Sequence, residues 1–369
     1  MALHSLSLGI VFDLSLPPYL GSPLRHLGAP PREREVCLTF FEEILTQGLR
    51  GLTLNVNSWL SQHWMEQGGF ACLDRLQSLL RYGLVEMTGT AAHHPILPLL
   101  NPIEARRQVV LNTAVQKRLL SEDWQPAGLF PPELAYGHEL VPLLSSLGMR
   151  WCLSDDANFG SLHGFVPYDW VPQVGELGVL LRSRHWSQVV ASPGALPGNF
   201  VAEELVRSCG QWFENGRGYV ILAVPGMSLM QPGYFDFLWP FLARLQAHDN
   251  VEIKHCSQIV HEFEGREFEV PPGSWKSSVD DFWNGDFFAP WNSPHQSKHQ
   301  ILWRLTELAW SSLEKLRESM DLGMNSDNFE WVSLSAPAPQ TLTYLLDVIQ
   351  AGQPEQVHQA RLWLELLTE

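Results

Sequence analysis

A strand–helix–strand stretch decides the fold of this 369-residue chain, and it opens with Leu84-Val85-Glu86-Met87-Thr88. A segment of helical period follows over Ile103–Leu120, and a second short apolar run follows at Ala127–Phe130. Two strands separated by a helix pair in parallel, because the connection crosses back over the sheet. The same order of elements recurs along the chain as far as about residue 265.

Eight apolar, β-branched or aromatic runs are predicted as strands: Leu8–Phe12, Leu52–Asn55, Leu84–Thr88, Ala127–Phe130, Arg150–Leu153, Val179–Arg182, Tyr219–Val224 and Val251–Lys254. The predicted helices between them are Val36–Gln47, Cys72–Tyr82, Ile103–Leu120, Glu139–Leu147, Val201–Phe213 and Phe235–Ala247. Seven or eight such units fit a closed barrel better than an open sheet. We therefore predict an α/β protein with a (β/α)7–8 barrel over residues 1–265.

The clearest helix start is Asn101-Pro102-Ile103-Glu104. Asn is a favoured N-cap residue, and Pro fits the first helical position because its missing N–H has no helical partner there. A helix is therefore predicted to begin just after Asn101.

The alternation of strands and helices stops near Phe268, and residues 266–369 are predicted to form a second unit. It opens with a Trp-rich segment and continues with helices near Ser297–Met320, Gln340–Gln350 and Pro354–Leu367. We expect these helices to form a layer packed on the barrel.

Composition and charge exclude several classes of partner. The chain has 24 Lys and Arg residues against 40 Asp and Glu residues, which gives a formal net charge of −16. Nucleic acid and anionic membranes are not expected partners, because such a chain repels phosphate. No stretch approaches the roughly 18 apolar residues of a membrane helix, and a basic leader is absent, so a cytoplasmic protein is expected. The five cysteines are scattered and are expected to be reduced, packed thiols.

Polar residues follow several of the predicted strands, where a barrel of this kind places its substrate. They include Asp13, His93, His94, Glu133, Asp155, Asp156 and Arg184. Two carboxyl groups facing each other across a pocket suffice for glycoside cleavage. A metal site of Asp13 with His93 or His94 is an alternative, although the tight His spacing expected of metal-dependent deacetylases is absent.

Four runs in this order resemble the signatures of glycoside hydrolase family 57: Leu84–Leu100, Gly128–Tyr136, Leu147–Asp156 and Leu180–Ser187. The resemblance implies a barrel enzyme that acts on α-linked oligo- or polysaccharides by a retaining path and needs no cofactor or metal. It also implies that Glu133, in the turn Pro131-Pro132-Glu133, is the catalytic nucleophile.

The chain departs from this family at two turns. Phe12–Tyr19 lacks the histidine of the first signature, and Tyr219–Ser228 lacks the carboxylate that serves as acid and base. Asp155 or Asp156 is the predicted replacement, and Asp13 is a further candidate. Two hypotheses follow: a retaining α-glucan hydrolase or transglycosylase, or an inactive member that binds carbohydrate or a protein partner. The sequence leaves the oligomeric state open.

Each candidate also has a structural interpretation. Glu133 could cap a helix, Asp155 and Asp156 could be N-cap and turn residues, and Arg184 could pair with one of them. Of His93 and His94, only one is expected to face the pocket. The predicted substrate-binding set is Asp13, His93, His94, Arg184, Trp186, Trp275 and Trp291. The aromatic residues from Trp275 to Trp291 fit either a core between barrel and helices or a roof over the barrel mouth.

Overall fold

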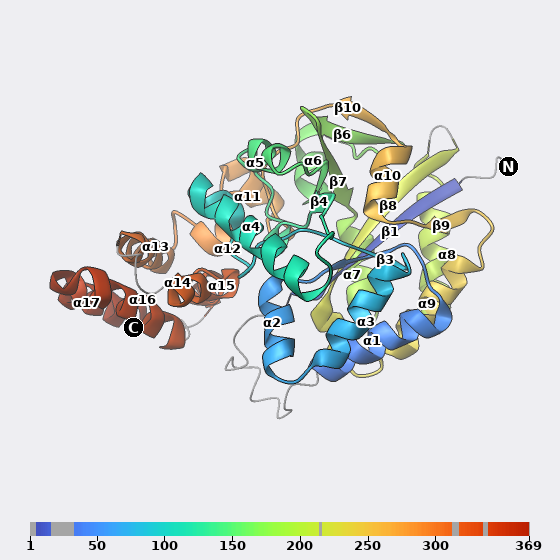
Figure 1. Ribbon diagram of the computed structural model, residues 1–369. Coiled ribbons are helices and arrows are strands. Elements are labelled where there is room, and N and C mark those ends of the chain that lie inside the picture. The colour runs from blue at the N-terminus through green and yellow to red at the C-terminus, as the bar shows by residue number, and fades with distance from the viewer. Residues whose placement is uncertain (1–4, 16–32, 214–215, 312–316, 335–338, 369) are drawn as a thin grey trace.

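The structure, a computed structural model (Figure 1), describes residues 5–15, 33–213, 216–311, 317–334 and 339–368. Its centre is a ring of parallel strands: β1 (Ser5–Asp13), β2 (Leu52–Asn55), β3 (Val85–Met87), β4 (Gly128–Leu129), β5 (Trp151–Asp155), β7 (Leu177–Arg182) and β8 (Arg217–Pro225). Neighbours pair from β3 through β2, β1, β8, β7 and β5 to β4. A parallel bridge between Gly89 and Leu129 closes the ring. The predicted α/β barrel is confirmed, with seven strands in the ring.

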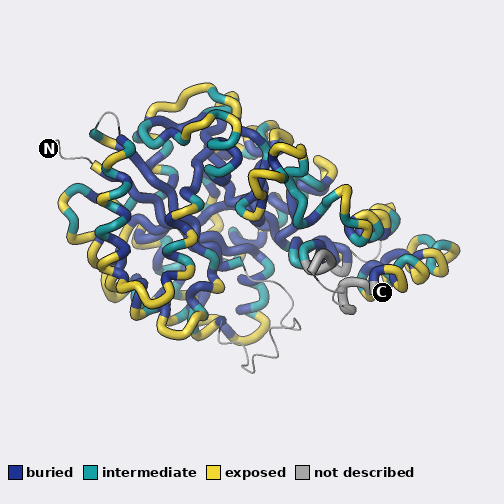
Figure 2. The backbone as a smooth tube through the Cα atoms, turned by 180° about the vertical axis from the view of Figure 1, so that it is seen from behind, coloured by how far each residue is buried: buried dark blue, intermediate teal, exposed yellow. Residues whose placement is uncertain are grey.

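The strands are apolar on both faces, because one face lines the barrel interior and the other meets the surrounding helices. In β1, every residue after Ser5 is buried, and buried residues run through the centre of the barrel (Figure 2). The predicted eighth strand exists as β9 (Val251–Ile253), but it pairs with β1 at Leu6–Leu8. It therefore lies beside the amino-terminal half of β1, outside the closed ring.

The six helices predicted between the barrel strands all form, with ends within a few residues of those expected. They are α1 (Glu33–Gln47), α3 (Phe70–Arg81), α4 (Pro102–Leu119), α5 (Leu140–Ser146), α8 (Gly198–Cys209) and α9 (Tyr234–Gln246). In α3 the buried residues Cys72, Leu73, Leu76 and Leu79 recur every three or four positions, as a helix packed on a core requires. At α4, the side chain of Asn101 accepts a hydrogen bond from the Glu104 N–H at 2.9 Å, which confirms the predicted start.

Several short elements were not predicted: α2 (Ser58–Glu66), α6 (Asp156–His163), α7 (Arg184–Ala191), α10 (Cys256–Glu262), β6 (Trp170–Val174) and β10 (Glu264–Glu267). Strand β6 runs antiparallel to β7, and β10 pairs with β6. These two strands extend the sheet away from the ring. The predicted boundary between residues 265 and 266 falls inside β10.

The C-terminal region is helical. It comprises α11 (Val279–Asn284), α12 (Ala289–Asn292), α13 (Ser297–Trp310), α14 (Arg317–Gly323), α15 (Ser326–Leu334), α16 (Pro339–Gly352) and α17 (Val357–Thr368). Figure 1 shows α13, α16 and α17 at one side of the barrel, with α14 and α15 nearer to it. The predicted helix Ser297–Met320 corresponds to α13 and the start of α14, and residues 312–316 lie outside the described part. One buried cluster joins barrel residues such as Leu129 to Leu302, Phe329 and Leu345, so the helices share a core with the barrel wall.

All five cysteines are buried and unpaired, as expected of packed thiols. Burial raises the pKa of Cys72 to about 11. No helix in the described ranges is long and apolar enough to cross a bilayer.

Candidate active site

A pocket of about 470 Å³ opens at the carboxyl ends of the barrel strands, where barrels of this type hold their substrates. The ends of β1 and β8, helix α7, and the loops after β3 and β4 form most of its wall, and residues of the C-terminal region complete it. The titratable residues that line it are Asp13, His94, Glu133, Arg182, Lys276, Asp327 and Glu330. This volume lies within the range of about 300–1,000 Å³ typical of small-ligand sites.

Glu133 lies in the short turn Pro132–Leu134, directly after β4, and is 4% exposed. Its φ angle of 59° is in the left-handed region that few residues other than glycine adopt. Among the described residues, the other non-glycine positions of this kind are His94 and Leu134, and His94 lines the same pocket. Such backbone conformations cluster at functional sites, where the surrounding structure holds them in place.

Both carboxylate oxygens of Glu133 have partners. Oε2 accepts a hydrogen bond from Trp275 Nε1 at 2.6 Å and lies 3.1 Å from Lys276 Nζ. Oε1 accepts from Ser326 Oγ at 3.2 Å and lies 4.0 Å from His94 Nδ1. Burial raises the pKa of Glu133, but Lys276, His94 and the Trp275 hydrogen bond outweigh it and leave the pKa below its ordinary value. Glu133 is therefore ionised at neutral pH.

The segment Gly273–Ser278 is hydrogen-bonded to the turn that contains Glu133. Backbone hydrogen bonds join Tyr136 and Gly273 in both directions, at 2.8 and 3.0 Å, and Trp275 N–H donates to the Glu133 carbonyl at 3.2 Å. A Cβ atom at position 273 would lie 1.5 Å from Asn158 Nδ2 and would displace that side chain from its hydrogen bond to the Pro272 carbonyl, which favours glycine there. These contacts fix the backbone from which Trp275 and Lys276 reach Glu133.

Helix α15 brings a second carboxyl group, Asp327, to the pocket. The start of the helix is tied to the loop after β3, because Ser326 N–H donates to the His94 carbonyl and Asn325 Nδ2 donates to the His93 carbonyl, each at 3.0 Å. One carboxylate oxygen each from Glu133, Asp327 and Glu330 lie within 4.8 Å of one another. Burial and the nearby charge of Glu133 raise the pKa of Asp327 to about 7. Near neutral pH the pocket therefore holds an ionised carboxyl group beside one that retains its proton in a large share of molecules.

Asp13, at the end of β1, is a buried, hydrogen-bonded residue of the pocket wall. Its Oδ1 accepts from Asn55 Nδ2 at 2.8 Å and from Ser15 N–H at 3.0 Å. Burial raises the pKa of Asp13, and the proximity of His94 and the bond from Asn55 offset only part of that effect. Residues 16–19 of the turn that follows lie outside the described part of the chain.

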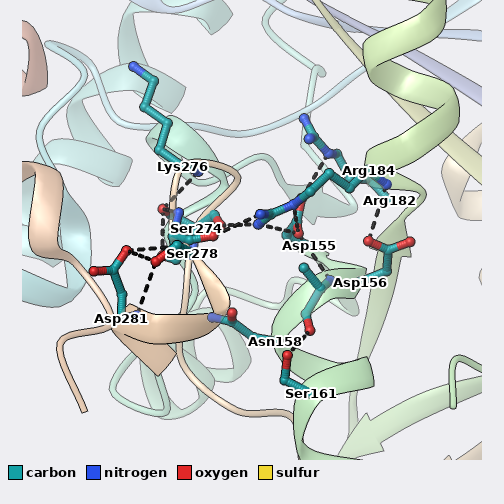
Figure 3. Close-up of polar contacts among 12 residues, drawn as sticks. Asp155, Asp156, Asn158, Ser161, Arg182, Arg184, Ser274, Lys276, Ser278 and Asp281 are labelled. Atoms are coloured by element: carbon teal, nitrogen blue, oxygen red, sulfur yellow. Dashed lines mark hydrogen bonds and ion pairs between the residues drawn. The ribbon is translucent and has the colours of Figure 1, made fainter. Parts of the chain in front are cut away.

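Asp155, Asp156 and Arg184 belong to a polar network beside the pocket (Figure 3), which shares Arg182 with the pocket wall. Asp155 forms ion pairs with Arg182 Nε at 2.9 Å and Arg184 Nη2 at 2.6 Å. Arg184 also donates to the carbonyls of Ser274 and Ser277, and this fixes the segment that carries Lys276. Asp155 caps α6 through Ala157 N–H at 3.1 Å.

Asp156 accepts from Arg184 N–H at 3.2 Å, and burial and Asp155 raise its pKa to about 7. Neither this carboxyl group nor that of Asp155 lines the pocket.

The other predicted substrate-binding residues are divided between the pocket and the core. His94 and Trp275 line the pocket, whereas His93 lies 3.8 Å from Asp321 and does not. Trp186 and Trp291 are buried in the hydrophobic core. Of the tryptophans from 275 to 291, Trp291 is buried in the core, Trp275 lines the pocket and Trp283 is 67% exposed.

The end of β8 carries no carboxylate. Pro225, Gly226 and Met227 line the pocket there, and Met227 is 43% exposed, so its side chain does not fill the pocket.

In the described part of the chain, Glu133, Asp327 and Glu330 are the one group of three side chains with metal-ligand chemistry. Lys276 Nζ lies 3.1 Å from Glu133 and 2.5 Å from Glu330, so an ammonium group already supplies positive charge between these carboxylates. Asp13 with His93 or His94 does not form such a group of three.

Sequence reasoning missed Lys276, Asp327 and Glu330. No local pattern marks them, because they follow no barrel strand and reach Glu133 only through the packing of the C-terminal region. The one local signal is the cap of α15, in which Asn325 Oδ1 accepts from Asp327 N–H at 3.0 Å.

Comparison with known proteins gives a family and a fold. The model of Glycosyl hydrolase family 57 matches residues 32–272, more than half of the chain. No curated protein sequence matches the chain.

Three solved structures illustrate the structural likeness. The 4-α-glucanotransferase from Thermococcus litoralis has a TM-score of 0.69 at 14% identity, over 96% of this chain and 60% of that one. The branching enzyme from Pyrococcus horikoshii has a TM-score of 0.66 at 15% identity, over 97% and 94%. The α-amylase AmyC from Thermotoga maritima has a TM-score of 0.66 at 12% identity, over 99% and 96%. This chain thus spans less than two thirds of the glucanotransferase but nearly all of the other two. At these identities the likeness shows the fold alone.

Proposed function

Because the chain belongs to glycoside hydrolase family 57, we propose that it cleaves or transfers α-linked glucosyl groups by a retaining double displacement, with Glu133 as nucleophile and Asp327 as acid and base. The substrate class is an α-linked oligo- or polysaccharide, as the glucanotransferase, branching enzyme and amylase of similar fold suggest.

The reaction has two steps. In the first, a Glu133 carboxylate oxygen attacks the anomeric carbon, the glycosidic C–O bond breaks, and Asp327 gives its proton to the leaving oxygen. In the second, water or a sugar hydroxyl attacks the same carbon, the bond to Glu133 breaks, and Asp327 takes the proton of the attacking group. Water gives hydrolysis, and a sugar hydroxyl gives transfer.

The observation that carries this proposal is the contrast between Glu133 and Asp327. The pKa of Glu133 is below its ordinary value, whereas that of Asp327 is raised to about 7, although the two carboxyl groups line one pocket. Titratable pairs with pKa values pushed apart in this way are typical of a nucleophile and its acid. One oxygen of each lies within 4.8 Å of the other, so the two carboxyl groups are at least as close together as those of retaining glycosidases, which stand about 5–5.5 Å apart.

Asp155 is a weaker candidate for the acid because its two oxygens form ion pairs with Arg182 and Arg184 and it does not line the pocket. Asp156 has a suitable pKa but does not line the pocket. Asp327 has a raised pKa and also lines the pocket.

The second candidate function is that of an inactive member that binds carbohydrate or a protein in the same pocket. It is favoured by the end of β8, where Pro225, Gly226 and Met227 stand in place of the family's acid and base. A positioned acid or base contributes roughly 10²–10⁴ in rate, so turnover depends on whether Asp327 replaces that group.

The experiment measures turnover of maltooligosaccharides and of α-maltosyl fluoride by the wild-type protein, Glu133→Gln, Asp327→Asn and Asp156→Asn. We expect loss of activity in Glu133→Gln and a fall of about 10²–10⁴ in kcat/KM on maltooligosaccharides in Asp327→Asn. Fluoride needs no proton to leave, so Asp327→Asn should still form the glycosyl-enzyme. Added azide should then accelerate its turnover and yield an α-glycosyl azide.

Asp156→Asn is the matched control, because it removes a second carboxyl group of raised pKa from outside the pocket. It should retain activity. If azide rescues Asp156→Asn and not Asp327→Asn, the acid is Asp156. Background turnover by the wild-type protein, together with sugar binding that survives in Glu133→Gln, would favour the binding function.

A further inference from the structure

Lys276 links the carboxylate of Glu133 to the helical layer through an ion pair at each end. Its Nζ lies 3.1 Å from Glu133 Oε2 in the barrel and 2.5 Å from Glu330 Oε2 on α15. The same Nζ lies 5.7 Å from the centre of the Trp291 ring. Its side chain is 35% exposed, so the pairs are partly shielded from water.

Without Lys276, the carboxyl groups around Glu133 would have no positive charge paired with them directly from this segment. Glu133, Asp327 and Glu330 bring three carboxyl groups within 4.8 Å, and Lys276 lies against two of them. Like charges this close cannot all ionise readily, so one group keeps its proton. Lys276 pairs directly with Glu133 and Glu330, whereas no direct pair with Asp327 is present among the ion pairs of the described residues. The proton is therefore favoured on Asp327.

The backbone at Lys276 is fixed independently of these ion pairs. Arg184 donates to the carbonyls on either side, those of Ser274 and Ser277, at 3.1 and 2.8 Å. Ser274 and Ser277 are also hydrogen-bonded to each other through their hydroxyl groups at 2.9 Å. Figure 3 shows the Lys276 side chain leaving this segment in a direction away from Arg184. The backbone that carries the ammonium group of Lys276 is therefore held in place independently of Glu133.

We propose that Lys276 is a positioning residue that keeps Glu133 ionised and thereby leaves the transferable proton on Asp327, an inference that rests on the function proposed above. Glu133 also faces His94 from the loop after β3, Trp275 beside Lys276, and Ser326, Asp327 and Glu330 from α15. The positive charge of Lys276 favours the ionised form of the neighbouring carboxyl groups, whereas the negative charge of Glu330 disfavours it. Removing either charge should therefore shift the titration of these groups in opposite directions, which tests the proposal from both sides.

The test compares wild-type protein with Lys276→Met, Lys276→Arg and Glu330→Gln in the pH dependence of kcat/KM. Loss of a positive charge should move both limbs of the profile in Lys276→Met to higher pH, by about one to three units for a pair at this distance. Loss of a negative charge in Glu330→Gln should move both limbs to lower pH. Lys276→Arg keeps the charge and should keep the limbs near their wild-type positions. A lower rate in Lys276→Met with both limbs unmoved would overturn the proposal.

A second readout does not depend on turnover. Protein labelled with carboxyl-¹³C glutamate reports the titration of Glu133 by NMR, with its signal assigned by its loss in Glu133→Gln. We expect the Glu133 midpoint to rise in Lys276→Met and to fall in Glu330→Gln. Shifts of the midpoint without any turnover would sustain the role of Lys276 and reject the enzymatic function. Turnover with an unmoved Glu133 midpoint would support the enzymatic function and reject the role of Lys276.

Discussion

At the scale of single residues, the raised pKa on which the proposed role of Asp327 rests should also lower the stability of the fold at neutral pH. Its pKa is raised from 3.8 to about 7 in the folded protein, so the folded state holds this proton more tightly than the unfolded chain. Stability from this group is therefore highest in acid and declines as the pH rises from about 4 to about 7.

Asp327→Asn should accordingly raise Tm relative to wild type at pH 8, and the gain should shrink toward pH 4. Thermal unfolding at a series of pH values measures this. Asp156→Asn provides the control, because its pKa is also about 7 and it should show the same thermal trend without loss of activity. A Tm difference for Asp327→Asn that does not change with pH would contradict the raised pKa.

At the scale of elements, α4 is the helix whose start the sequence predicts from a local rule. Asn101→Ala removes the side-chain acceptor for the Glu104 N–H and should lower the free energy of unfolding by about 1 kcal/mol. Urea denaturation measures the loss. Asn101→Asp restores an acceptor and should recover most of the stability, whereas an unchanged midpoint in the Ala variant would show that the cap contributes little.

The elements that could be predicted are those whose formation depends on a short stretch of sequence. The strand Leu52–Asn55 was predicted with its observed bounds, because it is a short apolar run that the barrel buries on both sides. The helices α6 and α7 could not be predicted because each has only eight residues, too few for a helical period to stand out in the sequence. The place of β9 outside the ring depends on its pairing with β1, which no property of residues 251–254 encodes.

At the scale of the whole molecule, the candidate site joins residues far apart in sequence. Glu133, His94 and Asp13 could be predicted from the rule that barrel strands present functional residues at their carboxyl ends. Asp327 could not, since its position depends on how α14 and α15 pack on the barrel. That packing includes the pair of Arg107 on α4 with Asp321 on α14.

The docking of α14 on α4 should therefore control activity from a distance. Arg107 Nε donates to Glu104 at 3.0 Å and its Nη2 pairs with Asp321, which is 3% exposed and also accepts from Gln108 Nε2 at 2.9 Å. Arg107→Gln leaves these buried acceptors short of a donor, at a cost of roughly 1–3 kcal/mol. We expect faster hydrogen exchange over residues 317–334 and a lower kcat/KM, because Asp327 is then held less firmly beside Glu133.

Arg207→Gln is the matched control for that change. Arg207 pairs with Glu204 at the same helical spacing, but its side chain is 69% exposed and lies on α8, away from the pocket. Exposed pairs of this kind contribute little, so exchange over residues 317–334 and kcat/KM should stay at wild-type values. If Arg107→Gln speeds exchange there while kcat/KM is unchanged, then activity does not depend on the helical layer, and the acid must come from the barrel. If exchange becomes faster and kcat/KM falls in Arg107→Gln alone, the helical layer completes the active site.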